Sequence, residues 1–96
     1  MKTGFVYILK CSDGSYYTGV TNDPERRFAE HQQGQCDGYT RSRRPVEMVW
    51  ISEEMDILSA IENEKRIKGW RREKKEAIIN DEWDKLPGLS LSYKKK

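Results

Sequence analysis

We predict a small α+β domain in which a three-stranded antiparallel sheet is flanked by about three helices. Two observations lead to this fold class. Short runs of β-branched and aromatic residues are bounded by turn residues, as strands are, and the elements follow in the order strand, strand, helix, strand, helix, helix. That order favours an antiparallel sheet covered by helices. With 96 residues, the chain has the length of one domain.

The first two predicted strands form a hairpin. Residues 5–11 and 16–20 are rich in aromatic and β-branched side chains, and Asp13-Gly14 lies between them. An Asp-Gly pair between two such runs is a strong hairpin signal. The hairpin therefore opens the fold.

The length of this turn decides which side chains share a face of the sheet. A two-residue turn would place Tyr7 and Tyr17 on opposite faces, because side chains alternate along a strand. A three-residue turn with a left-handed Gly14 would instead pair Leu9 with Tyr17, and would place both tyrosines on one face. The residues alone leave both turns open, and tyrosines on strands are often only strand formers with one core face.

Capping residues mark the other elements. Asp23 is a good N-cap and Pro24 suits the first position of a helix, which continues to about residue 33, where Gly34 ends it. The further predicted elements are a strand over 46–51, a helix capped by Asp56 that reaches about Gly69, and a helix over 73–81. The domain is expected to cover residues 1–82, and residues 83–96 are expected to form a partly mobile tail.

Composition limits the core and the class of partner. Only 35% of the residues are hydrophobic and the mean hydropathy is -0.95, so the core must be small. The net charge of +2 is uninformative, but residues 65–75 hold seven basic residues against one acidic residue. Arg41, Arg43 and Arg44 form a second basic cluster. Such clusters can contact phosphates; an ordinary solvated surface explains the charge equally well.

Cys11 and Cys36 have no partner ligands at the spacing of a zinc site, so we expect two reduced thiols. The apolar run 5–9 is too short for a signal sequence or a membrane span. We therefore expect no membrane partner and a cytoplasmic location.

Glu64 interrupts the apolar side of the second predicted helix. It lies three residues after Ile61 and three before Ile67, where an apolar residue would be expected. Burying an unpaired carboxylate is costly, so such a residue usually has a cationic partner or a metal ion. The alternative is an ordinary ion pair with Lys68, one helical turn away.

Arg27 and His31 are four residues apart and therefore share one helix face. An arginine can hold a phosphate through two parallel hydrogen bonds, and a histidine can donate or accept a proton. Arg26 must point elsewhere. The alternative is a solvated helix surface without function.

Taken together, these residues resemble the GIY-YIG nuclease family, and most of all its small single-domain bacterial members. The two strand motifs would be Phe5-Val6-Tyr7 and Tyr17-Thr18-Gly19, of which the first lacks the Gly and Ile of the family name. Arg27 follows ten residues after the second tyrosine, and Glu64 takes the place of the helical glutamate. Other matching elements are Glu25-Arg26-Arg27, His31, Tyr39-Thr40 and Arg44-Pro45, with Asn80 as a candidate for a late polar residue.

The resemblance implies a metal-dependent endonuclease acting on DNA, including branched or damaged structures. Glu64 would hold Mg²⁺ or Mn²⁺, and Arg27 would stabilise charge in the transition state. Tyr7 would be the general base, Tyr17 would position the water, and His31 would share the proton transfer. No small-molecule cofactor is implied. Because both tyrosines must then face one site, we predict the three-residue turn.

The expected partner is nucleic acid, and a monomer is favoured. The residues expected to contact nucleic acid are Arg41, Arg43, Arg44, Lys68, Arg71 and Arg72. Two alternatives are a nucleic-acid-binding module of the same fold with little turnover, and a structural or protein-interaction domain. The spacing of the candidate catalytic residues favours the nuclease over the first alternative, and the basic clusters favour either over the second.

Overall fold

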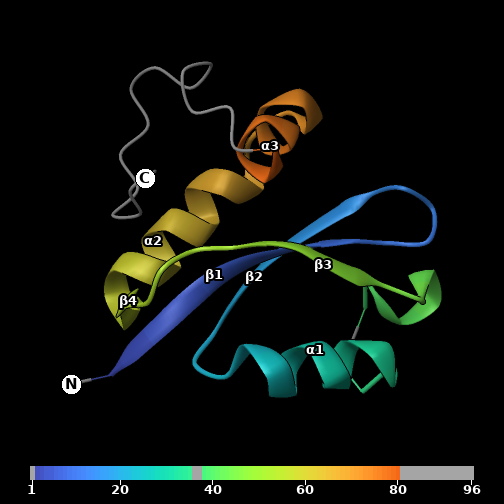
Figure 1. Ribbon diagram of the computed structural model, residues 1–96, viewed down its shortest axis with the longest axis horizontal. Helices are drawn as coiled ribbons and strands as arrows, with labels where there is room; N and C mark the ends of the chain where they lie inside the picture. Colours follow the sequence, from blue (N-terminus) through green and yellow to red (C-terminus); the bar gives the residue numbers. More distant parts are fainter. Residues whose placement is uncertain (1, 36–37, 81–96) are drawn as a thin grey trace.

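The predicted fold class is confirmed by a computed structural model, which describes residues 2–35 and 38–80 (Figure 1). The elements are β1 (Thr3–Lys10), β2 (Tyr16–Thr21), α1 (Pro24–Gln32), the short 3-10 helix η1 (Arg41–Arg43), β3 (Glu47–Ile51), β4 (Met55–Asp56), α2 (Ile57–Lys68) and α3 (Arg72–Ile79). The predicted domain end at residue 82, the tail over 83–96 and Cys36 lie outside the described residues. None of the described helices is long and apolar enough to cross a membrane.

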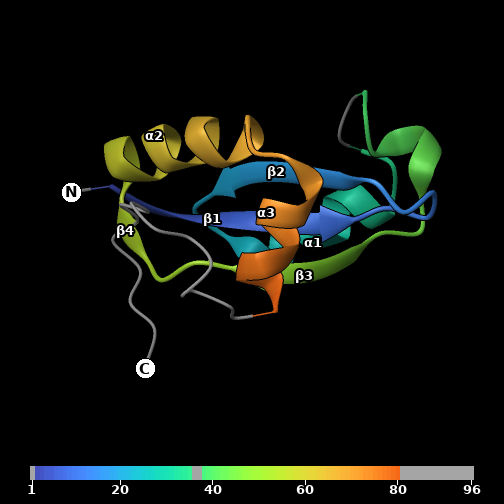
Figure 2. The same ribbon diagram turned by 90° about the horizontal axis from the view of Figure 1, so that it is seen from above.

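The sheet has the order β2-β1-β3 and lies between two helical layers. Helix α1 covers one face, whereas α2 and α3 cover the other (Figures 1 and 2). Because β1 is central and covered on both faces, its run from Val6 to Leu9 is at most 1% exposed. A short strand of continuous apolar character thus supplies core to both layers, which compensates for the lean composition.

The hairpin has the predicted register. Leu9 pairs with Tyr17 and Tyr7 pairs with Gly19, which places both tyrosines on the face that α1 covers. Gly14 has a φ of 86°, in the left-handed region that a three-residue turn requires. The three-residue turn is therefore confirmed, and so is the shared face of the two tyrosines.

Two features of the sheet were not predicted. Ile8 pairs with Trp50 but Leu9 pairs with Met48, so β3 carries one extra residue, Val49, as a β-bulge. The two-residue strand β4 also pairs with the start of β1. Both are too short to leave a periodic pattern in the sequence.

The helix caps are those expected from the sequence. The side chain of Asp23 accepts a hydrogen bond from the backbone N–H of Arg26 at 3.2 Å, and Asp56 does the same for Ser59 at 3.1 Å. Hydrogen bonds from Ser59 hold the pKa of Asp56 below its ordinary value. Helix α3 begins one residue before the predicted start and ends at Ile79. The local sequence therefore sets where α1 and α2 begin.

Gly19 makes room for the hydroxyl group of Tyr7. A Cβ atom at Gly19 would lie 2.5 Å from that oxygen, which is too close for any contact. We expect Gly19→Ala to lower the free energy of unfolding by about 1–3 kcal/mol, because the buried Tyr7 side chain must shift. Urea denaturation measures this change. Gly69→Ala is the matched control, since its φ is -83° and its nearest neighbour atom would be 3.7 Å away; equal losses in both variants would contradict the expectation.

Candidate active site

A buried chain of three polar side chains forms the centre of the site. The hydroxyl oxygen of Tyr7 lies 2.9 Å from Nε2 of His31, and Nδ1 of His31 lies 2.8 Å from the hydroxyl oxygen of Thr40. The three residues are 1%, 2% and 1% exposed. Each ring nitrogen of His31 therefore has a hydroxyl partner, which fixes the orientation of the imidazole and couples its tautomer to the directions of both hydrogen bonds.

Three separate parts of the chain contribute to this group: β1, α1 and the segment that follows α1. His31 lies on the side of α1 that faces the sheet, so a solvated helix surface is the wrong interpretation for His31. Thr40 was matched in the family resemblance without a role. Its only sequence signal is its place beside Tyr39, because a contact between a helix and a loop follows no periodic pattern.

Tyr17 brings a second ring to the same place. Its ring centroid lies 6.4 Å from that of Tyr7 and 5.2 Å from that of His31. Tyr39 stacks on Tyr17 with centroids 6.0 Å apart and an interplanar angle of 23°. Tyr17 is half-buried, and Tyr39 is exposed. The rings of Tyr7, Tyr17 and Tyr39 therefore extend from the buried His31 to the surface.

Arg43 holds Tyr39 in place. Its guanidinium carbon lies 4.1 Å from the ring centroid of Tyr39, its Nη1 donates to the Tyr39 carbonyl oxygen at 2.8 Å, and its Nε lies 3.0 Å from the carboxylate of Asp13. Three contacts to the protein itself give this arginine a structural role. The sequence predicted Arg43 only as a phosphate contact.

Glu64 and Lys68 form the ion pair that the sequence left open. The carboxylate oxygen Oε2 of Glu64 lies 3.1 Å from Nζ of Lys68, and the Glu64 side chain is 12% exposed. The hydrogen bond that Lys68 donates to Glu64, and then the negative charge of that carboxylate, raise the pKa of Lys68. Nζ of Lys68 also lies 6.0 Å from the ring centroid of Tyr17, so α2 places this pair beside the tyrosines.

The donor set fits a hard divalent cation held by one carboxylate. Within residues 2–35 and 38–80, no group of three or more His, Cys, Asp or Glu side chains is arranged to hold a metal ion. Mg²⁺ keeps several of its waters and is often bound by one or two carboxylates together with phosphate oxygens of the substrate. Glu64, whose side chain is 12% exposed, is the residue that would hold it.

Arg27 lies one helical turn before His31 on α1. Its side chain is 42% exposed and its Nη1 lies 3.2 Å from Glu30. Arg26 is 75% exposed and contacts the other oxygen of the same carboxylate. Arg27 lines an open depression of about 220 Å³, whose other lining residues are Thr21, Asn22, Asp23, Arg26 and Glu30.

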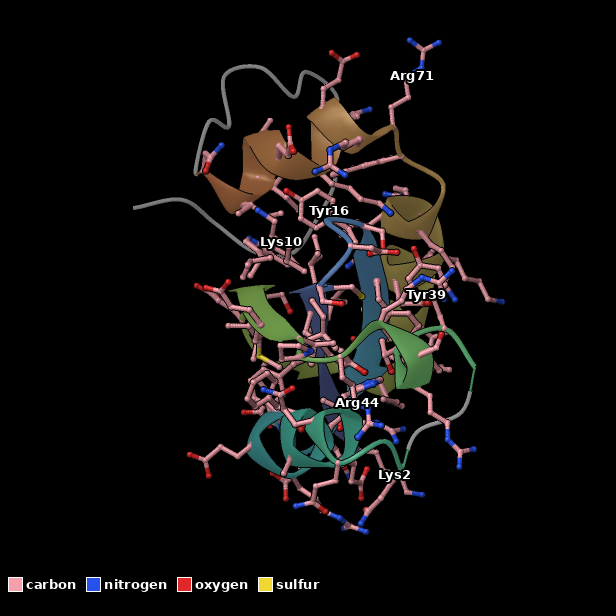
Figure 3. The ribbon with its side chains drawn as sticks, turned by 90° about the vertical axis from the view of Figure 1, so that its right-hand side faces the viewer. Lys2, Lys10, Tyr16, Tyr39, Arg44 and Arg71 are labelled. Atoms are coloured by element: carbon pink, nitrogen blue, oxygen red, sulfur yellow. The ribbon has the colours of Figure 1, made fainter. Side chains whose placement is uncertain are left out.

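The basic residues predicted to contact nucleic acid come from two separate parts of the chain. Arg44 lies beside α1, whereas Arg71 lies at the start of α3, well away from Arg44 (Figure 3). Arg44 donates to the carbonyl oxygens of Arg41 and Gln32, and Arg72 donates to that of Gly14 at 2.7 Å. The set therefore divides into Arg41, Arg43 and Arg44 after α1, and Lys68, Arg71 and Arg72 at the junction of α2 and α3. Asn80, the late polar candidate, is exposed at the end of α3.

The fold and these positions define a class of protein. A hairpin that presents two tyrosines on one face, an arginine on the next helix and a glutamate on the helix after β3 are the features of the GIY-YIG domain. The sequence model of the family described as the GIY-YIG catalytic domain matches residues 3–77 of this chain. The chain therefore belongs to the GIY-YIG nuclease family, whose members act on nucleic acids.

Its relatives include small proteins named UPF0213. The chain is 44% identical to one from Natronomonas pharaonis, over 81% of this chain and 92% of the relative. It is 42% identical to one from Staphylococcus aureus, over 84% of this chain and 99% of the relative. The solution structure of a UPF0213 protein from Bacillus halodurans is similar with a TM-score of 0.52 and 34% identity, covering 94% of this chain and 99% of that one.

Proposed function

We propose that the protein is a metal-dependent endonuclease that hydrolyses phosphodiester bonds in DNA. Its catalytic residues would be Tyr7, Tyr17, Arg27, His31 and Glu64. The observation that carries this proposal is the buried hydrogen-bonded chain from Tyr7 through His31 to Thr40, with Tyr17 beside it on the same face. A nuclease needs a group that takes a proton from the attacking water, and Tyr7, hydrogen-bonded to His31, would be that group.

The hydrogen bond from Tyr7 to His31 would make Tyr7 a better general base than an isolated tyrosine. A phenol with a pKa near 10 accepts a proton poorly at neutral pH. In this site, Tyr7 passes its own proton to Nε2 of His31 as it accepts one from the attacking water, while Nδ1–H of His31 donates to Thr40. The proton ends on the imidazole, so no free phenolate has to form.

Burial places a condition on this step. Tyr7 and His31 are almost fully buried, so the attacking water must lie inside the site and away from bulk solvent. Tyr17, half-buried beside both rings, would orient that water. Excluding bulk water strengthens each of these polar interactions in turn.

Arg27 and Glu64 supply the positive charge that the reaction needs. As the water attacks, negative charge grows on the phosphoryl oxygens, and the guanidinium of Arg27 can hold two of them in a fixed geometry. Mg²⁺ or Mn²⁺ held by Glu64 would neutralise further charge on the phosphate and on the leaving oxygen. We infer branched or damaged DNA as the substrate from the family resemblance. The cytoplasmic location and the monomeric state stay predictions.

Substitutions of Thr40 test the proposed proton transfer from Tyr7 to His31. We expect Thr40→Val to lower turnover about tenfold with little change in KM, because His31 loses the partner that sets its tautomer. Thr40→Ser keeps the hydroxyl group and should restore most of the activity and the wild-type pH–rate profile. Steady-state kinetics over a range of pH measures both. If the serine variant is as slow as the valine variant, Thr40 acts through packing, and the proposed proton transfer through His31 is wrong.

A nucleic-acid-binding module with little turnover is the second candidate, and one observation favours it. Lys68 already neutralises one oxygen of Glu64, as a helix-surface ion pair would. Such a module would bind DNA with an affinity that falls steeply as salt rises, but would not cut it in the presence of Mg²⁺ or Mn²⁺.

A further inference from the structure

We propose that an unpaired nucleotide of the substrate binds in a hollow beside Tyr17, with its base against tyrosine rings and its phosphate at two lysines. This inference rests on the proposed function and names the feature of the substrate that the protein recognises. The hollow has a volume of about 340 Å³, within the roughly 300–1,000 Å³ typical of ligand sites. Its lining residues, named here the tyrosine–lysine hollow, are Tyr16, Tyr17, Thr18, Tyr39, Lys68 and Lys75.

The lining matches the two chemical halves of a nucleotide. Three tyrosines, two from β2 and one from the segment after α1, provide flat apolar walls; Tyr16 and Tyr39 are labelled in Figure 3. Lys68 from α2 and Lys75 from α3 provide positive charge. Aromatic platforms beside basic groups are how proteins bind single strands, because every base has a face that can stack. A paired base keeps its faces inside the duplex, so only an unpaired base can use these walls.

A polar group in the hollow lacks a hydrogen-bond partner among the described residues. Thr18 is 2% exposed, and its hydroxyl oxygen is the one buried side-chain oxygen or nitrogen among the described residues without a hydrogen bond. Leaving a buried hydroxyl unpaired costs free energy. A sugar or base group in the hollow would supply the missing partner, which is an observation independent of the aromatic walls.

Lys68 and Lys75 both line the hollow and would form the site for an anion. Burial, followed by the positive charge of Lys68, lowers the pKa of Lys75. Glu64 pairs with Lys68, and Glu76 accepts a hydrogen bond from the hydroxyl group of Tyr16 at 3.0 Å. Lys75 forms no ion pair within residues 2–35 and 38–80, so a phosphate between the two ammonium groups would relieve their repulsion.

The hollow shares one residue, Tyr17, with the catalytic group. One side of this residue lies by Tyr7 and His31, and it also lines the hollow with Tyr39. A nucleotide held there would bring its neighbouring phosphodiester bond to the buried chain. The preferred substrates would then be junctions, gaps and flaps, where paired and unpaired nucleotides meet.

The test uses oligonucleotides that carry the fluorescent base 2-aminopurine, in the presence of a chelator so that no cutting occurs. The base is placed either at an unpaired position or at the same position within a full duplex. We expect the protein to quench the unpaired base and to leave the paired base unchanged, because stacking on tyrosine quenches this fluorophore. Equal quenching of the two substrates, or none, would overturn the inference.

Neighbouring residues on α3 provide a matched pair of variants. Lys75→Gln should weaken binding of the unpaired substrate about tenfold, whereas Lys74→Gln, which removes the same charge beside Trp70, should change it less than about twofold. Thr18→Val should also weaken binding while thermal stability stays equal or rises, since the unpaired hydroxyl is removed. Equal effects of the two lysine variants, or weaker binding only in proportion to lost stability, would overturn the inference.

Cleavage of the same oligonucleotides with Mg²⁺ separates the two proposals. If selective quenching occurs but the wild-type protein cuts nothing, the hollow stands and the proposed function fails. If cutting occurs without selective quenching and without a preference for unpaired positions, the inference about the hollow is wrong and the proposed function stands.

Discussion

Replacing Glu64 with glutamine should lower metal-dependent cleavage by at least about a thousandfold. The variant removes the negative charge that would hold the cation, and a bound metal ion contributes several kcal/mol to stabilising the transition state. The fold should survive, because the ion pair with Lys68 lies one turn along a helix and is worth only about 0.3–0.5 kcal/mol. Single-turnover cleavage rates measure the loss, and urea denaturation measures the stability.

Glu62→Gln is the matched control for this experiment. Glu62 lies on the same helix, is 73% exposed and has its partner Arg66 at 3.9 Å. The Glu62→Gln variant should cut DNA at the wild-type rate. If Glu64→Gln cuts as fast as Glu62→Gln, Glu64 is only the partner of Lys68 and holds no catalytic metal.

Arg27→Lys should lower the cleavage rate by about a hundred- to a thousandfold. Lysine keeps the charge but loses the planar group that holds two phosphoryl oxygens at once, and removing one such fixed interaction from a transition state costs about this much. Little of the loss should appear as weaker DNA binding, which is measured separately with the metal omitted.

Arg26→Lys makes the same change one residue earlier. Both arginines contact Glu30, but Arg26 is the more exposed of the two. The Arg26 variant should therefore cut within about twofold of the wild-type protein. Similar rates for the two variants would mean that Arg27 only pairs with Glu30 and does not touch the phosphate.

The hairpin could be predicted because its determinants are local. A left-handed Gly14 fixes the turn, the turn fixes the register, and strict alternation then decides that Tyr7 and Tyr17 share a face. The starts of α1 and α2 were equally predictable, since a single capping aspartate determines each. Turn and capping residues therefore determine the hairpin register and the starts of these two helices.

The interior of the site could not be predicted in the same way. Helix α1 has no continuous apolar stripe, so nothing in its pattern reveals that His31 is buried; hydrogen bonds to Tyr7 and Thr40 satisfy the buried ring instead. The partnership of Tyr16 with Glu76 joins residues 60 positions apart. Contacts of this kind depend on how the layers pack, which periodicity does not encode.

The basic residues show a further limit of sequence patterns. A cluster of arginines predicts positive charge at the surface, but not which donors the protein uses itself. Arg43 contacts Tyr39 and Asp13, and Arg72 donates to Gly14, so both arginines help to hold the hairpin turn. The sequence showed Lys75 only as part of a basic run and Thr18 only as part of a strand motif, because the packing of α3 against the sheet is what places them in one hollow.

The central claim is that this GIY-YIG domain cuts nucleic acid with the help of a divalent metal ion. The most direct test incubates the protein with single-stranded, duplex, flap and branched DNAs in Mg²⁺ or Mn²⁺, with a chelator as the control. We expect cutting of at least one structure that stops when the chelator is added. Binding that weakens with salt but never leads to metal-dependent cutting would contradict the claim and would make the protein a binding module of the same fold.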